Sequence, residues 1–306
     1  MNPVFRCISF LLMLEIRMKK LGLATALVLA MTGAHAYQFE IQGQSEALDS
    51  NDENRDYNNF TVGGQATYYF NNVDASKGPL AEAAFLNQAS NVAVGYNFAN
   101  LDDVKSQNVG IKAEAYLPTP YMPAYTSLSY SATDNDGKYG LSDDRGQRWA
   151  VEFGSVIAPN LLVAVGYTNV VEQTSFDTFT ILNSGFAKAA GETATIAEDQ
   201  DAITARTKYV GAITGTPMSI GFETGIVYGQ DTAYELKTDL YLNSQLSAGV
   251  SYAESSFAGS PDSAWGVNVN YFITPAIAVG ASYVNANAVG SDADMQTVGV
   301  NAKLRF

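Results

Sequence analysis

The stretch 297–306 constrains the fold of this chain more than any other. Its apolar and polar residues alternate strictly, and the two rows are Val298, Val300, Ala302, Leu304, Phe306 and Gly299, Asn301, Lys303, Arg305. Successive side chains of a β-strand point to opposite faces, so the pattern predicts a strand with one apolar and one polar face. Such a strand closes an outer-membrane barrel, where apolar side chains face lipid and polar ones face the lumen.

The N-terminus carries a targeting segment rather than part of the fold. Residues 18–20 (Met-Lys-Lys) are a short positive region, 21–31 form an apolar run, and 34–36 (Ala-His-Ala) have the small-x-small pattern of a cleavage site. These three parts predict a cleaved signal peptide over 18–36, and so a secreted chain.

The residues before the signal peptide, 1–17, are interpreted as an extension from a start assigned too early, with Met18 as the initiator. A lipoprotein anchor at Cys7 is a poorer alternative, because Arg6 stands where a small apolar residue belongs. The folded domain is therefore expected to span 37–306.

Removal of the signal peptide limits the chemistry of the mature chain. The single cysteine, Cys7, and the single histidine, His35, both leave with it. A disulfide, a thiol nucleophile, a histidine base and a Cys/His metal site are thereby excluded, so we expect no enzyme and no cofactor. The removed part holds four of the 17 basic and one of the 31 acidic side chains, which leaves 13 basic, 30 acidic and a net charge of −17. Such a chain repels nucleic acid.

The mature chain repeats segments of about ten alternating residues separated by turn residues, the pattern expected of barrel strands. We predict an all-β, antiparallel, up-and-down transmembrane barrel of about 14 strands. The expected strands are 37–45, 60–70, 91–99, 107–117, 124–132, 147–157, 161–171, 203–213, 218–228, 233–242, 245–255, 264–273, 276–286 and 297–306.

The connections between these segments support the same interpretation, because they fall into two classes that alternate. The short, Pro/Asn-rich connections are 118–123, 158–160, 214–217, 243–244 and 274–275. The longer, acidic ones are 48–57, 133–146, 172–202, 257–263 and 287–294, with shorter members at 100–106 and 229–232. Tight periplasmic turns and longer outward loops have this pattern. A soluble β-sandwich or solenoid is the alternative, but neither requires two alternating loop classes.

Several segments resemble a known family. Val73 to Ser90, together with 37–43 (Tyr-Gln-Phe-Glu-Ile-Gln-Gly), 114–120, 205–211 and 270–276, is similar to the gammaproteobacterial porin family. The nearest group is the outer-membrane proteins of thirty-three to thirty-six kilodaltons. The resemblance covers 18–306 and implies a pore that passes water; it assigns no individual residue a role.

The inward connection 71–90 is longer than the other short turns. Gly78-Pro79 interrupts the chain, and 80–89 contains helix-forming residues. We expect a short helix at the periplasmic rim, with Phe85 and Leu86 buried against the barrel wall. A gate or plug is the alternative to this structural role.

The lumen face is where transport selectivity would be set. Strand parity places charged residues of both signs there, and the pore-lining candidates are Lys112, Glu114, Arg148, Glu152, Arg206, Lys208, Glu223, Lys237, Lys303 and Arg305, joined by Glu40, Glu235 and Asp239. If 297–306 pairs with the first strand, Lys303 and Arg305 face Glu40. Two arrangements of these lumen charges are possible. In the more specific hypothesis, a basic wall (Arg148, Arg206, Lys208, Arg305) lies opposite an acidic one and creates a field across the pore. In the simpler hypothesis, the charges are paired and hydrated.

Two further features are open to a functional interpretation. The loop 172–202 contains Phe176, Phe179 and Phe186. So apolar a loop is expected to fold back and narrow the pore, or else to lie over the rim. The acidic stretch 134–137 begins like a calcium loop, but Arg145 stands where the bidentate Glu is needed, so we expect no dedicated metal site.

The sequence therefore predicts an outer-membrane porin of a Gram-negative bacterium that passes water and small polar solutes by passive diffusion. A structural or adhesive barrel with a blocked lumen is the alternative. The expected partners are outer-membrane lipid, lipopolysaccharide and the outer-membrane assembly machinery, for which Leu304 and Phe306 are the candidate signal. The solute, the ion preference and the choice between monomer and trimer stay open.

Overall fold

The computed structural model describes residues 36–50, 59–101, 104–137, 144–171, 175–193, 200–229, 232–256, 263–287 and 294–306. The predicted extension and nearly all of the predicted signal peptide lie outside these described residues. So do 172–174 and 194–199 of the long loop.

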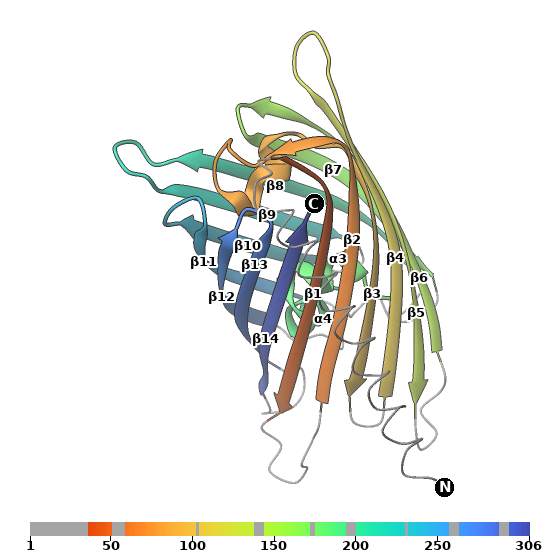
Figure 1. Cartoon of the computed structure of the whole chain (residues 1–306). Helices are drawn as coiled ribbons and strands as arrows, with labels where there is room; N and C mark the ends of the chain where they lie inside the picture. The colour runs from red at the N-terminus through yellow and green to blue at the C-terminus, as the bar shows by residue number, and fades with distance from the viewer. Residues whose placement is uncertain are drawn as a thin grey trace, which may run out of the picture.

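Fourteen antiparallel strands form one closed barrel in which each strand pairs with its neighbours in the chain and β14 pairs with β1 (Figure 1). The strands are β1 (Ala36–Ser50), β2 (Asn59–Asp74), β3 (Asn91–Leu101), β4 (Val104–Leu117), β5 (Ala124–Gly137), β6 (Asp144–Ala158), β7 (Leu161–Val171), β8 (Gln200–Ala212), β9 (Ser219–Tyr228), β10 (Thr232–Tyr241), β11 (Leu246–Ser255), β12 (Ser263–Thr274), β13 (Ile277–Asn287) and β14 (Asp294–Arg305). The predicted fold class, strand count and strand positions are confirmed.

Several strands run further than predicted at the end that carries the long loops. β1 continues to Ser50 rather than to residue 45, and β5 continues to Gly137 rather than to residue 132. In β1 the inward side chains of this extension, Glu46 and Leu48, are buried rather than in water. An apolar inward residue such as Leu48 breaks the alternation that marks a barrel strand, whereas the backbone ladder continues. Sequence pattern therefore underestimates the length of these strands.

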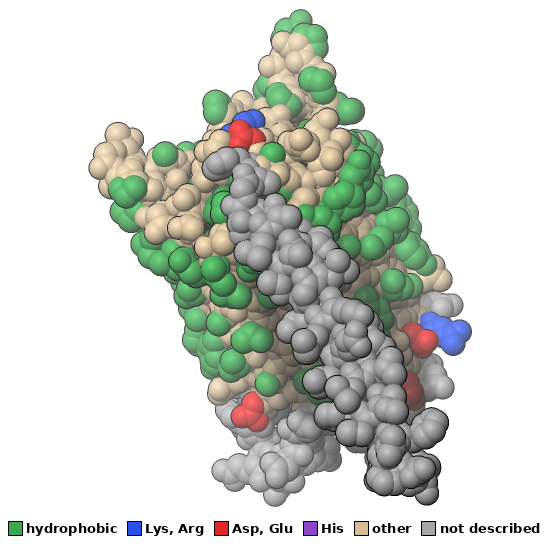
Figure 2. Space-filling model, in the orientation of Figure 1, with side chains coloured by type: hydrophobic (Ala, Val, Ile, Leu, Met, Phe, Trp, Pro, Cys, Tyr) green, Lys and Arg blue, Asp and Glu red, His purple; other side chains and the backbone are tan. Residues whose placement is uncertain are grey.

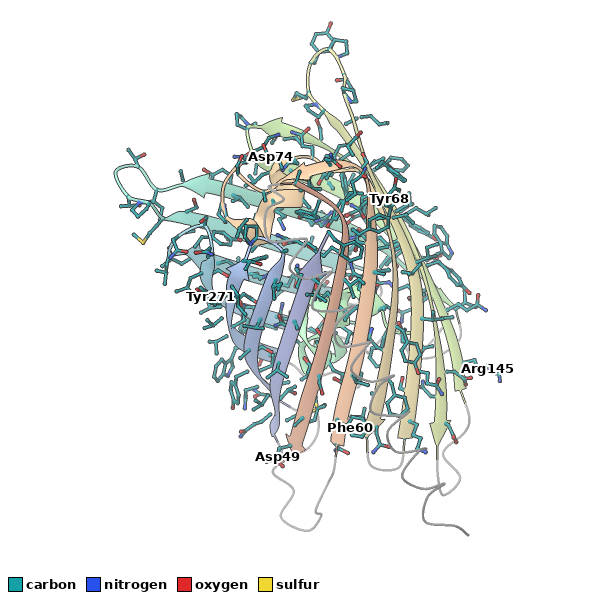
Figure 3. The ribbon with its side chains drawn as sticks, viewed as in Figure 1. Asp49, Phe60, Tyr68, Asp74, Arg145 and Tyr271 are labelled. Atoms are coloured by element: carbon teal, nitrogen blue, oxygen red, sulfur yellow. The ribbon has the colours of Figure 1, made fainter. Side chains whose placement is uncertain are left out.

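The outer face of the barrel is apolar, as Figure 2 shows for one side. On β14 the outward row includes Val298 and Val300, each 59% exposed. Aromatic side chains cluster near both strand ends of this face; Figure 3 labels Phe60 at the end with long loops and Tyr68 and Tyr271 toward the other. An apolar band flanked by aromatic residues is what a barrel needs to sit in a bilayer.

Four short helices lie in two connections. The β2–β3 connection contains the 3₁₀ helix η1 (Leu80–Glu82) and the helix α2 (Ala83–Leu86). The β7–β8 connection contains α3 (Thr178–Ser184) and α4 (Phe186–Thr193). Among the described residues, no helix is long and apolar enough to cross a membrane. Below, the end of the barrel with the C-terminus and the short turns is called the turn end, and the opposite end the loop end.

Candidate channel lumen

Helix α3 lies inside the barrel against a part of the wall that contains glycines. Gly95 on β3 and Gly110 on β4 point toward it, and a Cβ built on Gly95 would lie 2.6 Å from Cγ2 of Thr178. A Cβ on Gly110 would lie 3.0 Å from Oγ1 of Thr178. Glycine at these positions lets the helix approach the backbone of the wall, so the barrel is shaped to receive it.

Side chains of the wall also bind the backbone of this insertion. The amide of Gln42 donates to the carbonyl oxygen of Leu182 at 3.0 Å, and that of Gln44 donates to Ile181 at 2.9 Å. Near the start of α3, Asn108 donates to the carbonyl oxygen of Phe176 at 2.5 Å. Buried carbonyl groups at helix ends need such partners, so α3 is anchored through its main chain as well as its side chains.

Helix α4 is held by a buried carboxylate on β1. Glu46 is 4% exposed, and its Oε2 accepts hydrogen bonds from the backbone N–H of Phe186 at 2.8 Å and from Oγ1 of Thr61 at 2.9 Å. Gly185, between the two helices, has a φ of +87°, and a Cβ there would lie 2.8 Å from Glu46. Further along α4, Lys188 forms an ion pair with Glu235 of β10 at 3.0 Å. The loop 172–202 thus folds into the lumen over its described part, as expected.

The β2–β3 connection reaches across the turn end of the lumen (Figure 1). The backbone of Leu80 donates to the carbonyl oxygen of Ser244 at 2.8 Å and accepts a hydrogen bond from Nη1 of Arg305 at 2.8 Å. Glu82 forms an ion pair with Lys208 of β8 at 3.0 Å and accepts a hydrogen bond from Tyr241 of β10 at 2.7 Å. We call residues 75–90 the turn-end strap, because they connect opposite sides of the barrel.

The strap contains the predicted short helix, and Phe85 packs against the barrel wall as predicted, on the buried cluster of Tyr125, Val156, Leu162 and Ala164. The predicted full burial of Phe85 and Leu86 is wrong. Both are only half-buried, whereas Leu80 and Ala83 are buried against the wall. Phe85 lines the lumen and lies under Nζ of Lys208, 5.2 Å from its ring centroid. The reason is that the strap crosses the lumen, so Phe85 meets the wall on one side and the cavity on the other.

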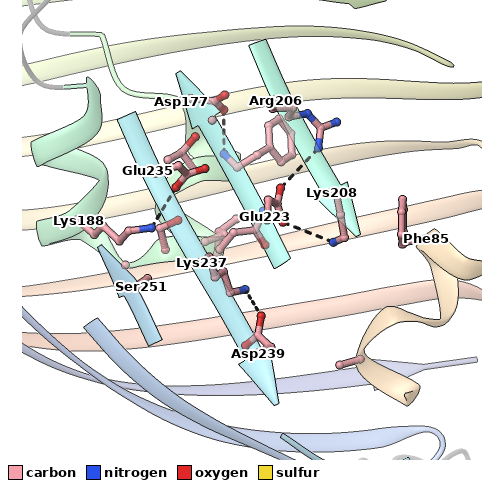
Figure 4. A pocket seen from close by; sticks show the side chains of 18 of the residues that line it. Phe85, Asp177, Lys188, Arg206, Lys208, Glu223, Glu235, Lys237, Asp239 and Ser251 are labelled. Carbon is pink, nitrogen blue, oxygen red and sulfur yellow. Dashed lines mark hydrogen bonds and ion pairs between the residues drawn. The ribbon is translucent and has the colours of Figure 1, made fainter. Parts of the chain in front are cut away.

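A cavity of about 570 Å³ lies in the lumen and touches both insertions. Phe85 and Glu82 of the strap border it, and so do Phe179 of α3 and Lys188 of α4. Figure 4 shows part of its lining, with charged side chains projecting from β8, β9 and β10. The lumen is therefore narrowed at two levels, with a polar chamber in contact with both.

Arg206 of β8 is the centre of the charge network around this cavity. Its guanidinium lies 3.1 Å from Glu152, 3.5 Å from Glu223 and 3.9 Å from Glu114. It also donates to the hydroxyl of Tyr125 at 2.6 Å. Charge-assisted contacts of this kind fix the side chain and keep a partly buried cation compensated.

The other lumen charges are paired in the same way. The pairs are Lys112–Glu114 at 3.0 Å, Lys208–Glu223 at 3.6 Å, Lys237–Asp239 at 3.2 Å, Lys303–Glu40 at 3.1 Å, Arg305–Glu40 at 2.7 Å and Arg148–Asp177 at 4.0 Å. Each cation of the hypothetical basic wall has a carboxylate within 4.0 Å. That more specific hypothesis is wrong, since neighbouring strands contribute opposite charges; the expected pairing of Lys303 and Arg305 with Glu40 is confirmed.

The structure places nine of the ten pore-lining candidates on the cavity: Lys112, Glu114, Arg148, Glu152, Arg206, Lys208, Glu223, Lys237 and Lys303. Arg305 points inward too, but it is 2% exposed beneath the strap, between the rings of Tyr37 and Phe272. Sequence reasoning did not single out Glu82, Asp177 or Lys188, which also border the cavity. They lie in connections, where strand parity says nothing.

The environment of Glu82 keeps it ionised. Burial alone would raise the pKa of its carboxyl group, but the ammonium groups of Lys208 and Lys237 and the hydrogen bond from Tyr241 outweigh burial. The pKa of Glu82 is therefore held below its usual range. The ion pair that fastens the strap to β8 is thus present at neutral pH.

Metal binding has no support in the described part of the chain. No group of three or more His, Cys, Asp or Glu side chains there could hold a metal ion. Asp134, from the stretch that begins like a calcium loop, instead lies 3.6 Å from Arg145, and both side chains are well exposed.

Comparisons with known proteins decide the family. A family model described as "Putative general bacterial porin" matches residues 18–306. The chain belongs to this porin family. Its structure is also similar to the crystal structure of the Acinetobacter baumannii outer-membrane protein Omp33, with 48% identity, a TM-score of 0.67, and coverage of 89% of this chain and 99% of that chain. This porin is therefore an outer-membrane channel of a Gram-negative bacterium.

One more distant solved structure shares only the fold. A deltaS2S3 mutant of the monoaromatic hydrocarbon channel TodX is 8% identical, covers 90% of this porin and 91% of that chain, and gives a TM-score of 0.50. No curated protein sequence matches the porin at a significant level.

Proposed function

We propose that this porin passes water and small polar solutes by passive diffusion, with no covalent step. The observation that carries the proposal is the charged cavity of about 570 Å³ in the lumen, in contact with insertions from both ends. A wall of paired, partly hydrated charges stays wet and admits polar solutes, whereas the two insertions exclude large ones.

The least covered part of the wall gives the route. Helix α3 packs against β2, β3 and β4, and α4 packs against β10 to β14. The remaining arc, β5 to β9, touches the insertions at its ends, where Ser131 donates to the carbonyl oxygen of Phe176 and Phe85 packs against Leu162. Between these contacts it contributes polar side chains to the cavity, among them Ser127, Glu152 and Thr204. Solutes would follow this arc from the loop end and leave past Phe85 of the strap.

Osmotic shrinkage of proteoliposomes tests this route. Thr204 on β8 lines the cavity, and its neighbour Ile203 is 61% exposed on the lipid face. Thr204→Trp should lower both water and glycerol flux by narrowing the arc, whereas the matched control Ile203→Trp should leave both unchanged. Equal fluxes in the two folded variants would place the route elsewhere.

A structural or adhesive barrel with a blocked lumen is the second candidate. The observation that favours it is the double anchoring of the lumen, by α3 and α4 on one side and the strap on the other. A reconstituted barrel with no water flux above protein-free vesicles would support this candidate and contradict the channel route.

The partners of the outer surface follow from its chemistry. We propose that the apolar band contacts outer-membrane lipid and lipopolysaccharide, and that the assembly machinery binds the end of β14. Leu304 and Phe306 are 38% and 41% exposed on the outer face, which leaves them accessible for such recognition.

A further inference from the structure

The charges of the lumen are paired, but they do not balance on every part of the wall. Around Arg206, four carboxylates (Glu82, Glu114, Glu152, Glu223) share three cations, Lys112, Arg206 and Lys208. These ion pairs join β4, β6, β8, β9 and the strap. We call them the acid-rich cluster, because one negative charge is left over.

The seam between β14 and β1 has the opposite excess. The carboxylate of Glu40 is shared by Lys303 at 3.1 Å and Arg305 at 2.7 Å, so one positive charge is left over among the inward side chains of the seam. The terminal carboxylate of Phe306 is bound instead by the backbone N–H groups of Gln38 and Phe39 at the rim. Arg305 is buried beneath the strap, whereas Lys303 borders the cavity and its side chain is 23% exposed. The excess positive charge therefore meets the cavity through Lys303.

These two excesses face each other across the barrel. In the closed ring of strands, β8 lies opposite β1, separated from it by equally many strands in each direction. The pairs between them, Lys237–Asp239 and Lys188–Glu235, contribute one charge of each sign (Figure 4). The cavity thus has a negative wall formed by β4, β6, β8, β9 and the strap, and a positive wall at β14, although the charges of these described groups cancel in sum.

We propose that the cavity favours small zwitterions of the amino-acid and betaine class over neutral and singly charged solutes of the same size. The carboxylate of the solute would turn toward Lys303 and its ammonium group toward Glu152 and Glu223. A solute with one charge gains at one wall and loses at the other, whereas a zwitterion gains at both. A volume of about 570 Å³ accommodates a solute of this size.

This inference rests on the proposed function, and flux of isomeric probes separates the two. At neutral pH glycine is a zwitterion, and its isomer glycolamide is neutral. In liposomes with the mature porin, we expect glycine flux to exceed glycolamide flux by about two- to fivefold, the ratio that a partly hydrated charge contact gives. Water flux is measured on the same vesicles.

Three variants assign the preference to the two walls. Lys303→Gln should remove the excess positive charge, and Glu152→Gln the excess negative charge, so each should bring the flux ratio toward one. The double variant Asp134→Asn/Arg145→Gln removes a balanced, exposed pair outside the cavity and should keep the preference. Heat-modifiable migration on gels verifies that each variant is folded before its flux is compared.

The outcomes are distinct. Equal glycine and glycolamide fluxes with normal water flux would overturn the zwitterion preference and leave the channel intact. Loss of the preference in the double variant to the same extent as in Lys303→Gln would overturn the assignment to the two walls. Absence of flux for water and both solutes would overturn the proposed function itself.

Discussion

The ring of Phe306 stacks on the ring of Phe39, with centroids 5.5 Å apart and an angle of 11° between the planes. Their backbones are joined as well: Phe306 donates to the carbonyl oxygen of Phe39 at 2.9 Å and accepts from its N–H at 2.7 Å. The last residue of the chain therefore completes the seam between β14 and β1 at the turn end, where the barrel would otherwise have an open edge.

Deleting Phe306 should lower the folded, heat-modifiable fraction on gels, because it removes both the ring stack and the last hydrogen bonds of the seam. The matched control is Phe153→Ala, which removes a ring that is 61% exposed on the lipid face of β6, away from the seam. Lys303→Ala should assemble normally and alter only selectivity. Normal assembly without Phe306 would show that the seam does not need its last residue.

The strap should stay fastened through mild acidification. Because the pKa of Glu82 is lowered, its ion pair with Lys208 stabilises the strap above the usual carboxyl range. That stabilisation is lost only as the pH falls below this range and through the lowered pKa. Glycerol flux should therefore be constant from neutral pH down to about 5 and rise below about 4.

The variant Glu82→Gln tests the same ion pair without a change of pH. Removal of the charge should raise glycerol flux already at neutral pH, because Lys208 then loses the partner that holds the strap across the lumen. Tyr241→Phe removes only the hydrogen bond to Glu82 and should have a smaller effect. A Glu82→Gln variant with the pH profile of the parent would show that another group fastens the strap.

Replacement of residues 175–197 by a short Gly-Ser linker should increase single-channel conductance, because it removes α3 and α4 from the lumen. Gly95→Val tests the same point without a deletion, since a side chain there collides with Thr178 and should dislodge α3. Val165→Leu, at a lipid-facing position on β7 that is 58% exposed, is the control. Unchanged conductance after the replacement would mean that the loop does not limit the pore.

Arg305→Met should destabilise the barrel by about 1–3 kcal/mol, the usual loss when a buried acceptor is left without its donor. The substitution frees the carbonyl oxygen of Leu80 and leaves Glu40 with Lys303 alone. Thermal unfolding in detergent measures the loss. Lys303 is far less buried, so Lys303→Met should cost less; the reverse order would contradict the anchoring role of Arg305.

The sequence pattern predicted the strands of the barrel wall well, but it predicted the contacts of the segments inside the lumen poorly. Alternation along β8 places Arg206 and Lys208 on the inner face, because a strand has only two faces. The order of the strands along the chain then gives the neighbours of each strand in the barrel. No such rule applies to Glu82 or Lys188. Glu82 reaches Lys208, and Lys188 reaches Glu235, because of the path that each connection takes through the lumen. The sequence of these connections has no periodic pattern from which that path could be predicted.

One signal in the sequence did bear on the inserted helix. Gly95 and Gly110 occupy inward positions on neighbouring strands, where a barrel normally presents polar side chains to the lumen. Inward glycines at paired positions are typical of a close approach by another part of the chain. The hypothesis of a basic wall failed for a related reason. Strand alternation gives the face on which each charged side chain lies, but not its position along the barrel axis. The contacts of Glu223 with both Arg206 and Lys208 could therefore not be predicted.

The glycine bed beneath α3 also matters for engineering this porin as a nanopore. A wall with bare backbone at Gly95 and Gly110 is thinner on its inner side than the charged arc formed by β5 to β9. Removal of α3 would therefore not leave a centred hole. It would leave an eccentric opening along β2 and β3, with an uncharged side facing a charged one, and a polymer threaded through it would contact two chemically different walls.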